Sequence, residues 1–98
     1  MSLSVIIRQE AEAEMAEAFR WYEDRVTGLG SEFLLAVGAV LEGVARNPRR
    51  YPVVHKTIRR ALLRRFPYGV FFVPEPRRIV VLAVFHAKRN PRRWMKRV

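Results

Sequence analysis

The stretch Ile79-Val80-Val81-Leu82-Ala83-Val84-Phe85 decides the fold, because every one of its positions is apolar. Successive residues of a strand point to opposite faces of a sheet, so an unbroken apolar run predicts a strand that is covered on both faces. The run is far shorter than the roughly 20 residues that a helix needs to cross a bilayer. We therefore expect a soluble protein with no membrane association, in which this segment is a central strand.

Three other segments have the composition of strands. They are Ser4–Arg8, Ile58–Phe66 and Tyr68–Val73. Pro74-Glu75-Pro76 follows the last of them, and prolines suit a hairpin connection better than a central strand. Ser4–Arg8 is separated from the other strands by two helical segments, so we expect it to join an edge of the sheet through a crossover. Its partner strand stays open.

The segments Glu10–Arg25 and Ser31–Arg46 repeat apolar residues at helical spacing. The first stripe is Met15, Phe19, Tyr22 and Val26, and the second is Phe33, Val37, Val40, Leu41 and Val44. Gly28 and Gly30 separate the two helices, and Asn47-Pro48 ends the second. We expect an antiparallel helix hairpin that packs on a small, mostly antiparallel sheet after the N-terminal strand. The fold class is α+β, in one domain that spans residues 1–98.

The two signs of charge are segregated along the chain, whose net charge is +10. Eight acidic and four basic residues lie up to Asn47, whereas fifteen Lys and Arg face only Glu75 from Pro48 onward. So many like charges repel one another in a folded domain, and a polyanionic or acidic partner relieves that repulsion. A basic surface kept only for solubility is the alternative interpretation.

The composition also excludes several kinds of site. The sequence has no Cys, so a disulfide, a thiolate nucleophile and a cysteine-ligated metal are ruled out. His55 and His86 are not at metal-ligand spacing, and we expect neither a metal nor a cofactor. The N-terminal residues lack the pattern of a signal peptide, so we expect a cytoplasmic protein.

Five local motifs, in this order, resemble the ParE/RelE toxin superfamily. They are Glu17-Ala18-Phe19-Arg20-Trp21-Tyr22-Glu23, Gly28-Leu29-Gly30-Ser31-Glu32-Phe33, Asn47-Pro48-Arg49-Arg50-Tyr51-Pro52, the segment Ile58–Tyr68, and the segment Val84–Trp94. The resemblance covers nearly the whole chain. It implies a type II toxin that a cognate antitoxin, expected to be acidic, holds inactive. Superfamily members of the ParE type poison DNA gyrase, whereas members of the RelE type cut mRNA on the ribosome.

Two positions depart from the pattern of the RelE-like nucleases, which place an Arg after the aromatic residue that opens the penultimate strand and a Tyr or His near the C-terminus. Here Gly69 follows Tyr68, and the C-terminal aromatic residue is Trp94, whose indole does not titrate near neutral pH. If the chain is a nuclease, the candidate acid or base is His86, because an imidazole titrates near neutrality. Arg60, Arg65 and Lys88 would then hold the phosphate. The alternative is that His86 only ends the last strand.

The remaining candidates are binding residues. They are Arg59, Arg64, Arg89, Arg92, Arg93, Trp94 and Trp21. The pairs Arg59-Arg60 and Arg64-Arg65 are expected to lie in one edge strand that their charge protects. Arg60 and Arg64 are also expected to project together as a clamp for a phosphate or carboxylate. The tail Arg89–Arg97 suits nucleic acid or an acidic antitoxin segment. Trp21 lies off the apolar stripe, so we expect it to be half-exposed, as an interface anchor or as a residue flanking the core.

These observations favour a ParE-like gyrase inhibitor without chemistry of its own, monomeric or dimeric when free. The alternatives are a RelE-like ribosome-dependent endoribonuclease and a plain nucleic-acid-binding module.

Overall fold

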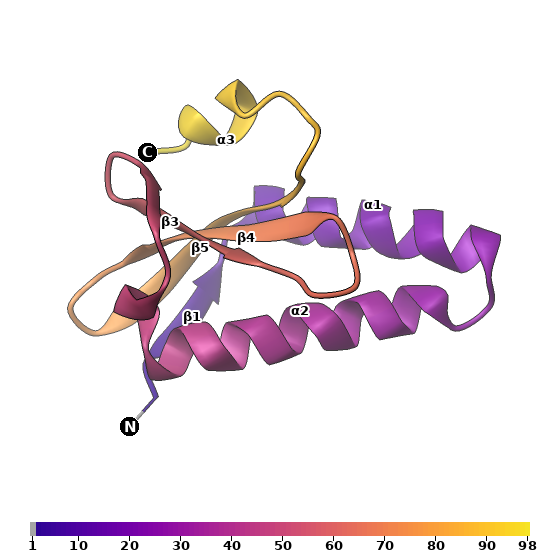
Figure 1. Cartoon of the computed structure of the whole chain (residues 1–98), viewed down its shortest axis with the longest axis horizontal. Helices are drawn as coiled ribbons and strands as arrows, with labels where there is room; N and C mark the ends of the chain where they lie inside the picture. Colours follow the sequence, from indigo (N-terminus) through magenta and orange to yellow (C-terminus); the bar gives the residue numbers. More distant parts are fainter. Residues whose placement is uncertain (1) are drawn as a thin grey trace.

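The computed structural model describes residues 2–98 and shows a five-stranded sheet with two long helices on one face and a short helix on the other (Figure 1). The elements are β1 (Ser4–Ile7), α1 (Gln9–Arg25), α2 (Leu29–Arg46), a 3-10 helix (Pro48–Arg50), β2 (Val53–His55), β3 (Ile58–Leu62), β4 (Tyr68–Pro74), β5 (Arg78–His86) and α3 (Arg92–Met95). The strand order is β1-β5-β4-β3-β2. This confirms the predicted α+β class.

Strand β5 lies inside the sheet, as its apolar run predicts. β1 pairs with it in parallel, with Ser4 opposite Arg78 and Ile7 opposite Val81, while β4 pairs with it antiparallel on the other side. The helix hairpin provides the long crossover that a parallel pair needs. β1 is therefore the edge strand that was expected, and β5 is its partner.

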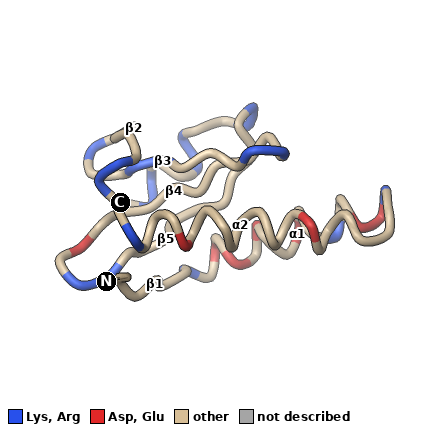
Figure 2. The backbone as a smooth tube through the Cα atoms, turned by 60° about the horizontal axis from the view of Figure 1, so that its bottom comes forward, with Lys and Arg blue, Asp and Glu red and all other residues tan. Residues whose placement is uncertain are grey.

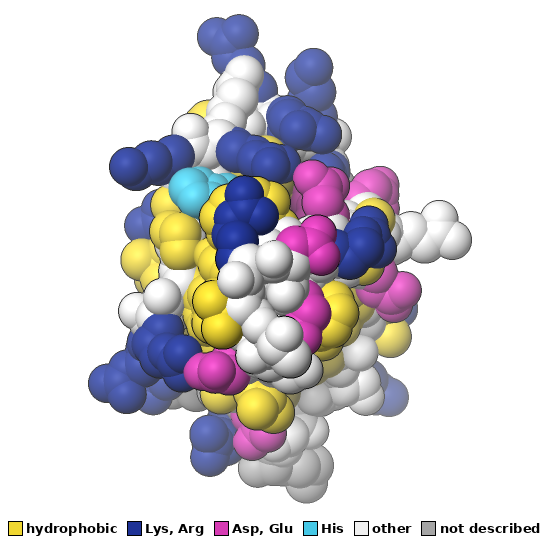
Figure 3. Space-filling view, turned by 90° about the vertical axis from the view of Figure 1, so that its right-hand side faces the viewer, with side chains coloured by type: hydrophobic (Ala, Val, Ile, Leu, Met, Phe, Trp, Pro, Cys, Tyr) yellow, Lys and Arg dark blue, Asp and Glu magenta, His cyan; other side chains and the backbone are white. Residues whose placement is uncertain are grey.

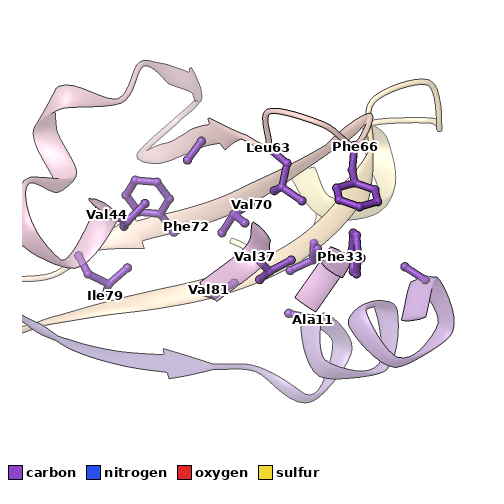
Figure 4. Close-up of a cluster of buried hydrophobic side chains, with 13 residues drawn as sticks. Ala11, Phe33, Val37, Val44, Leu63, Phe66, Val70, Phe72, Ile79 and Val81 are labelled. Atoms are coloured by element: carbon purple, nitrogen blue, oxygen red, sulfur yellow. The ribbon is translucent and has the colours of Figure 1, made fainter. Parts of the chain in front are cut away.

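The main core fills the space between the helix hairpin and the sheet (Figure 4). Phe33, Val37 and Val44 of α2 are fully buried there, which confirms the predicted stripe of the second helix. In α1 the buried positions are instead Ala11 and Ala18, with Met15 and Tyr22 partly buried beside them. Small residues let α1 pack closely on β5. Val26 was expected on this stripe but is 58% exposed, because α1 ends at Arg25 and Val26 belongs to the turn.

Glycines make the turn between α1 and α2 tight. Gly28 has φ +92°, a left-handed conformation that L side chains rarely adopt. A Cβ on Gly30 would lie 2.6 Å from the carbonyl oxygen of Phe19, so only glycine allows this approach of the two helices. The Glu23 carboxylate accepts hydrogen bonds from the N–H groups of Gly28 (2.8 Å) and Gly30 (2.9 Å), which satisfies donors at the start of α2. The second helix therefore begins at Leu29, two residues before the predicted Ser31.

A second core lies on the opposite face of the sheet, under α3. Trp94 is only 5% exposed and stacks on Phe71 with 4.2 Å between ring centroids. A bulge in β5 supports this core: Phe71 pairs with Ala83 and Phe72 with Val81, so Leu82 has no partner across the ladder. Leu82 and Ala83 consequently both belong to the second core, together with Trp94. The C-terminal segment thus forms a short helix that this indole holds against the sheet.

The segment Ile58–Phe66, predicted as one strand, differs from its prediction. β3 ends at Leu62, so Arg64 and Arg65 lie in the following loop and not in the strand. β3 is also not an edge strand, because β2, which the sequence pattern did not reveal, pairs with it on the outer side. β2 has only three residues, too few to show an alternating pattern.

Candidate functional site

The four residues expected to form a nuclease site are not brought together. Arg60 is opposite Phe71 in the β3–β4 ladder, and paired residues share a face, so Arg60 lies on the α3 side. His86 is opposite Tyr68, which packs against the core on the helix side. The sheet thus separates Arg60 from His86.

Arg65 lies apart from both of these residues, against α2. Its guanidinium contacts the carboxylate of Glu32 at 2.6 Å, and both side chains are about half exposed or more. Lys88 is close to His86, but the contact is made by its backbone N–H, which donates to His86 Nδ1 at 3.0 Å. In the neutral ring this leaves the proton on Nε2. Only His86 and Lys88 of the predicted set are neighbours.

His86 borders a groove of about 690 Å³ between α1 and the end of β5. Its ring meets that of Tyr68 edge to face, with 5.2 Å between centroids. Burial raises the pKa of Tyr68; the charge of Arg89 opposes this rise, and that of Glu17 adds to it. Burial, and then the neighbouring Tyr68, also raise the pKa of Tyr22. Both phenols therefore stay protonated at neutral pH.

Charges of both signs line this His86 groove. Arg20, Lys88 and Arg89 contribute cations, while Glu14, Glu17 and Asp24 of α1 contribute carboxylates. Glu17 and Arg89 lie 3.9 Å apart. A phosphate chain is repelled by carboxylates, so this mixture suits a protein surface better than RNA. Figure 3 shows the end of the molecule that carries this groove. Apolar side chains reach the surface there, with Lys and Arg above them and most Asp and Glu to their right.

On the other face of the sheet, Gly69 marks the position where the nucleases carry an arginine. A Cβ on Gly69 would lie 3.3 Å from Arg60 Cγ and 3.3 Å from Phe71 Cε1. The stem of Arg60 thus occupies the space beside the glycine, and its Nε is buried without a hydrogen-bond partner in residues 2–98. Trp94 was expected among the binding residues, and it lies buried in the second core.

The C-terminal tail keeps most of its predicted cationic surface. Lys88, Arg89, Arg92, Arg93 and Lys96 are exposed. Arg97 is different: its side chain is 15% exposed and forms an ion pair with Glu14 at 2.9 Å. Its Nη1 also donates to the carbonyl oxygen of Leu82 at 3.0 Å, and Glu14 Oε1 accepts from Val84 N–H. β1 ends at Ile7, so these two side chains cover the edge of β5 that β1 leaves open.

Two more predicted binding residues have defined surroundings. Trp21 is 51% exposed, which confirms its expected partial exposure, and the Arg25 guanidinium lies 3.5 Å from the centroid of its ring. Arg59 donates to the carbonyl oxygens of Tyr51 (2.6 Å) and Arg49 (3.2 Å). Arg59 therefore fixes the loop before β2, a role that sequence reasoning missed.

A second groove, of about 490 Å³, lies between α2, the segment before β2 and the loop after β3. We call it the α2 groove. Its lining includes Leu35, Ala39, Gly43, Arg46, Arg50, Tyr51, Arg64 and Arg65. Figure 2 shows how charge is distributed along the chain. Lys and Arg gather over the β2–β3 end and the C-terminal segment, whereas most Asp and Glu lie on the two long helices. Sequence reasoning missed this groove because it is made by segments far apart in the chain.

Neither a metal site nor a membrane-spanning helix is present in the described part of the chain. Among residues 2–98 no three His, Asp or Glu side chains group closely enough to hold a metal ion. No helix among them combines the length and the apolar character needed to cross a membrane.

The fold is similar to that of chains in two solved toxin–antitoxin systems. The solved chromosomal ParDE system from P. aeruginosa contains a chain that is 18% identical, with a TM-score of 0.69, covering 89% of this chain and 98% of that one. The RelBE2 toxin–antitoxin complex from Mycobacterium tuberculosis contains one that is 16% identical, with a TM-score of 0.60, covering 88% and 99%. No curated protein matches the chain. The family model of the ParE toxin of the type II toxin–antitoxin system parDE matches residues 5–91, and the chain belongs to this family.

Proposed function

We propose that this chain is a ParE-like toxin that inhibits DNA gyrase by binding to it, with no catalysis of its own, and that a cognate antitoxin holds it inactive in the cytoplasm. The observation that carries the proposal is the separation of Arg60 and His86 by the sheet. A general base and the cations that stabilise a developing phosphorane charge have to converge on one phosphate. The structural relatives, solved as toxin–antitoxin systems, support an antitoxin partner.

A gyrase cleavage assay tests this proposal. Purified toxin, added to gyrase and supercoiled plasmid, is expected to trap the cleaved complex and release linear DNA after protein digestion. Plasmid without gyrase should remain supercoiled. An inactive toxin in this assay, together with mRNA cuts in expressing cells, would reject gyrase as the target.

The alternative function is a RelE-like ribosome-dependent endoribonuclease. The observation that favours it is the groove in which His86, Lys88 and Arg89 meet. A His86→Ala variant distinguishes the two: a gyrase inhibitor should still arrest growth, whereas a nuclease that uses the imidazole should lose toxicity at unchanged thermal stability. Salt-dependent DNA binding without growth arrest would instead select the plain nucleic-acid-binding module.

A further inference from the structure

The C-terminal segment carries cations without carboxylates of its own to neutralise them. The residues from Ala87 to Val98 include six Lys or Arg and no Asp or Glu. Five of these cations are exposed: Lys88, Arg89, Arg92, Arg93 and Lys96. Arg8 is exposed as well, and its guanidinium donates to the carbonyl oxygen of Arg97 at 3.1 Å, so it lies beside the end of the segment. We call these five residues and Arg8 the tail surface. Lys and Arg project at the top of Figure 3, the end of the molecule where Figure 1 places α3.

The domain itself uses little of this charge. Within residues 2–98, Arg89 is the one member of the tail surface with a carboxylate partner, Glu17 at 3.9 Å. The other five members form no ion pair in that range. Like charges held this close repel one another and lower the stability of the fold, unless a polyanion neutralises them.

The tail surface is also held in a fixed position. Trp94 is 5% exposed and stacks on Phe71, and Arg97 pairs with Glu14 and donates to the carbonyl oxygen of Leu82. A segment that only kept the protein soluble would need no such anchors, because a mobile tail contributes the same charge. Fixed cations lose less conformational entropy when a partner binds, so the anchors favour binding.

The side chains of this surface suit a nucleic-acid duplex better than a protein or a membrane. Val98, at the chain end, is the one exposed large hydrophobic residue between Ala87 and Val98, so the surface lacks the apolar strip that an amphipathic protein segment or a bilayer would cover. Single strands are bound largely by stacking of their bases on aromatic rings, and Trp94 is buried. A duplex has its bases already stacked and presents phosphates outward, so cations alone can hold it.

We propose that the tail surface binds the phosphate backbone of duplex DNA without reading its sequence. α3 has four residues, about one turn, which is too short to lie in a groove and present several side chains to the bases. Contacts of Lys and Arg with phosphates position a duplex but do not specify a sequence. This activity goes beyond the inhibition of gyrase. The choice of DNA over an RNA duplex rests on the proposed gyrase target, whose substrate is DNA.

The test titrates the protein with a fluorescent DNA duplex of about 20 base pairs and follows anisotropy at several salt concentrations. The logarithm of the binding constant falls linearly with the logarithm of the salt concentration, with a slope of about 0.9 for each phosphate contact. Arg92→Gln with Arg93→Gln removes two cations, so the magnitude of the slope should decrease by about 1.8. Binding at about 50 mM salt should weaken about tenfold or more.

The matched control is Arg46→Gln with Arg77→Gln, which removes the same charge. Both residues are exposed and form no ion pair within residues 2–98; Arg46 ends α2, and Arg77 precedes β5, at the end of that strand opposite to the tail. The control should keep its slope within about 0.5 of that of the unmodified chain. Arg92→Lys with Arg93→Lys retains the charge and should keep the affinity within about threefold. Both tail variants should keep the Tm of the unmodified chain, because the two side chains are exposed.

Each failure has a distinct meaning. An unmodified chain without salt-dependent binding, or equal losses in the tail variant and the control, would overturn the inference. Tighter binding of a single strand or an RNA duplex of the same sequence would overturn the choice of duplex DNA. The gyrase cleavage assay separates this inference from the proposed function. Gyrase poisoning without DNA binding by the toxin would reject the tail surface alone, whereas DNA binding by a toxin that leaves gyrase active would reject the gyrase target and keep the tail surface.

Discussion

The ion pair between Arg97 and Glu14 holds the C-terminal tail to the domain, and its contribution to stability can be measured. Each side chain is only about 15% exposed, and the carboxylate also accepts from the backbone N–H of Val84. At 2.9 Å and an effective dielectric constant of 20, the attraction is about 6 kcal/mol before the desolvation of both charges is subtracted. Removing one partner leaves the other charge buried and unpaired, which costs about 3–5 kcal/mol.

We therefore predict that Glu14→Ala lowers the free energy of unfolding by about 3 kcal/mol, the lower end of that range, because Arg97 keeps its hydrogen bond to Leu82. For a domain of this size the loss corresponds to a fall in Tm of about 12 °C or more. Urea denaturation followed by circular dichroism measures the first quantity, and a thermal melt measures the second.

The matched control is Glu32→Ala, which removes the partner of Arg65. That pair is shorter, at 2.6 Å, but its side chains are 64% and 49% exposed. Exposed pairs contribute less than about 1 kcal/mol, so burial and not distance should decide the order of the two losses. Equal losses, or a larger loss for Glu32→Ala, would refute this reasoning. Adding Arg97→Ala to Glu14→Ala should cost less than the sum of the single changes.

Three further predictions concern stability. Trp94→Ala should cost about 3–5 kcal/mol in urea denaturation, because it empties the second core; a loss below about 1 kcal/mol would contradict the burial of the indole. Gly38→Ala should stabilise by about 0.5–1 kcal/mol, since its Cβ would meet nothing within 4 Å, whereas Gly30→Ala should destabilise, since its Cβ would lie 2.6 Å from a backbone oxygen. The raised pKa values of Tyr22 and Tyr68 stabilise the fold fully below the unfolded pKa of about 10, and that contribution is lost as pH rises through the folded pKa values. Replacing both by Phe should therefore reduce the fall in stability between about pH 10 and 12, and an unchanged alkaline fall would contradict this assignment.

Much of the fold could be predicted because its main signals are local. The apolar run Ile79–Phe85 indicates an inner strand wherever its partners come from, and the stripe of α2 follows from helical spacing alone. β2 escaped prediction because three residues carry no period. The burial of Trp94 also escaped, since it depends on a bulge at Leu82 that no composition rule reveals.

The candidate site could be predicted less well, because it depends on the register of the strands. A shift of one residue moves a side chain to the other face of a sheet, so the sequence cannot place Arg60 relative to His86. The excess of positive charge in the second half was predictable. Its division into an arginine-rimmed apolar groove and an exposed tail was not, because the groove joins α2 to a loop about 30 residues later.

The arginines differ in what they contact within residues 2–98: some bond to the fold, and others form no ion pair. Arg59 and Arg97 each donate a hydrogen bond to a backbone carbonyl oxygen of the domain, and Arg97 also pairs with the Glu14 carboxylate. Removing either side chain should therefore lower the stability of the fold. Arg50 and Arg64 satisfy no carboxylate in residues 2–98 and lie beside exposed apolar side chains. A charge kept only for solubility has no reason to border an apolar strip, because it adds solubility equally well elsewhere on the surface. The position of these two arginines, more than the net charge, is therefore the argument that the basic half of the chain is built for binding.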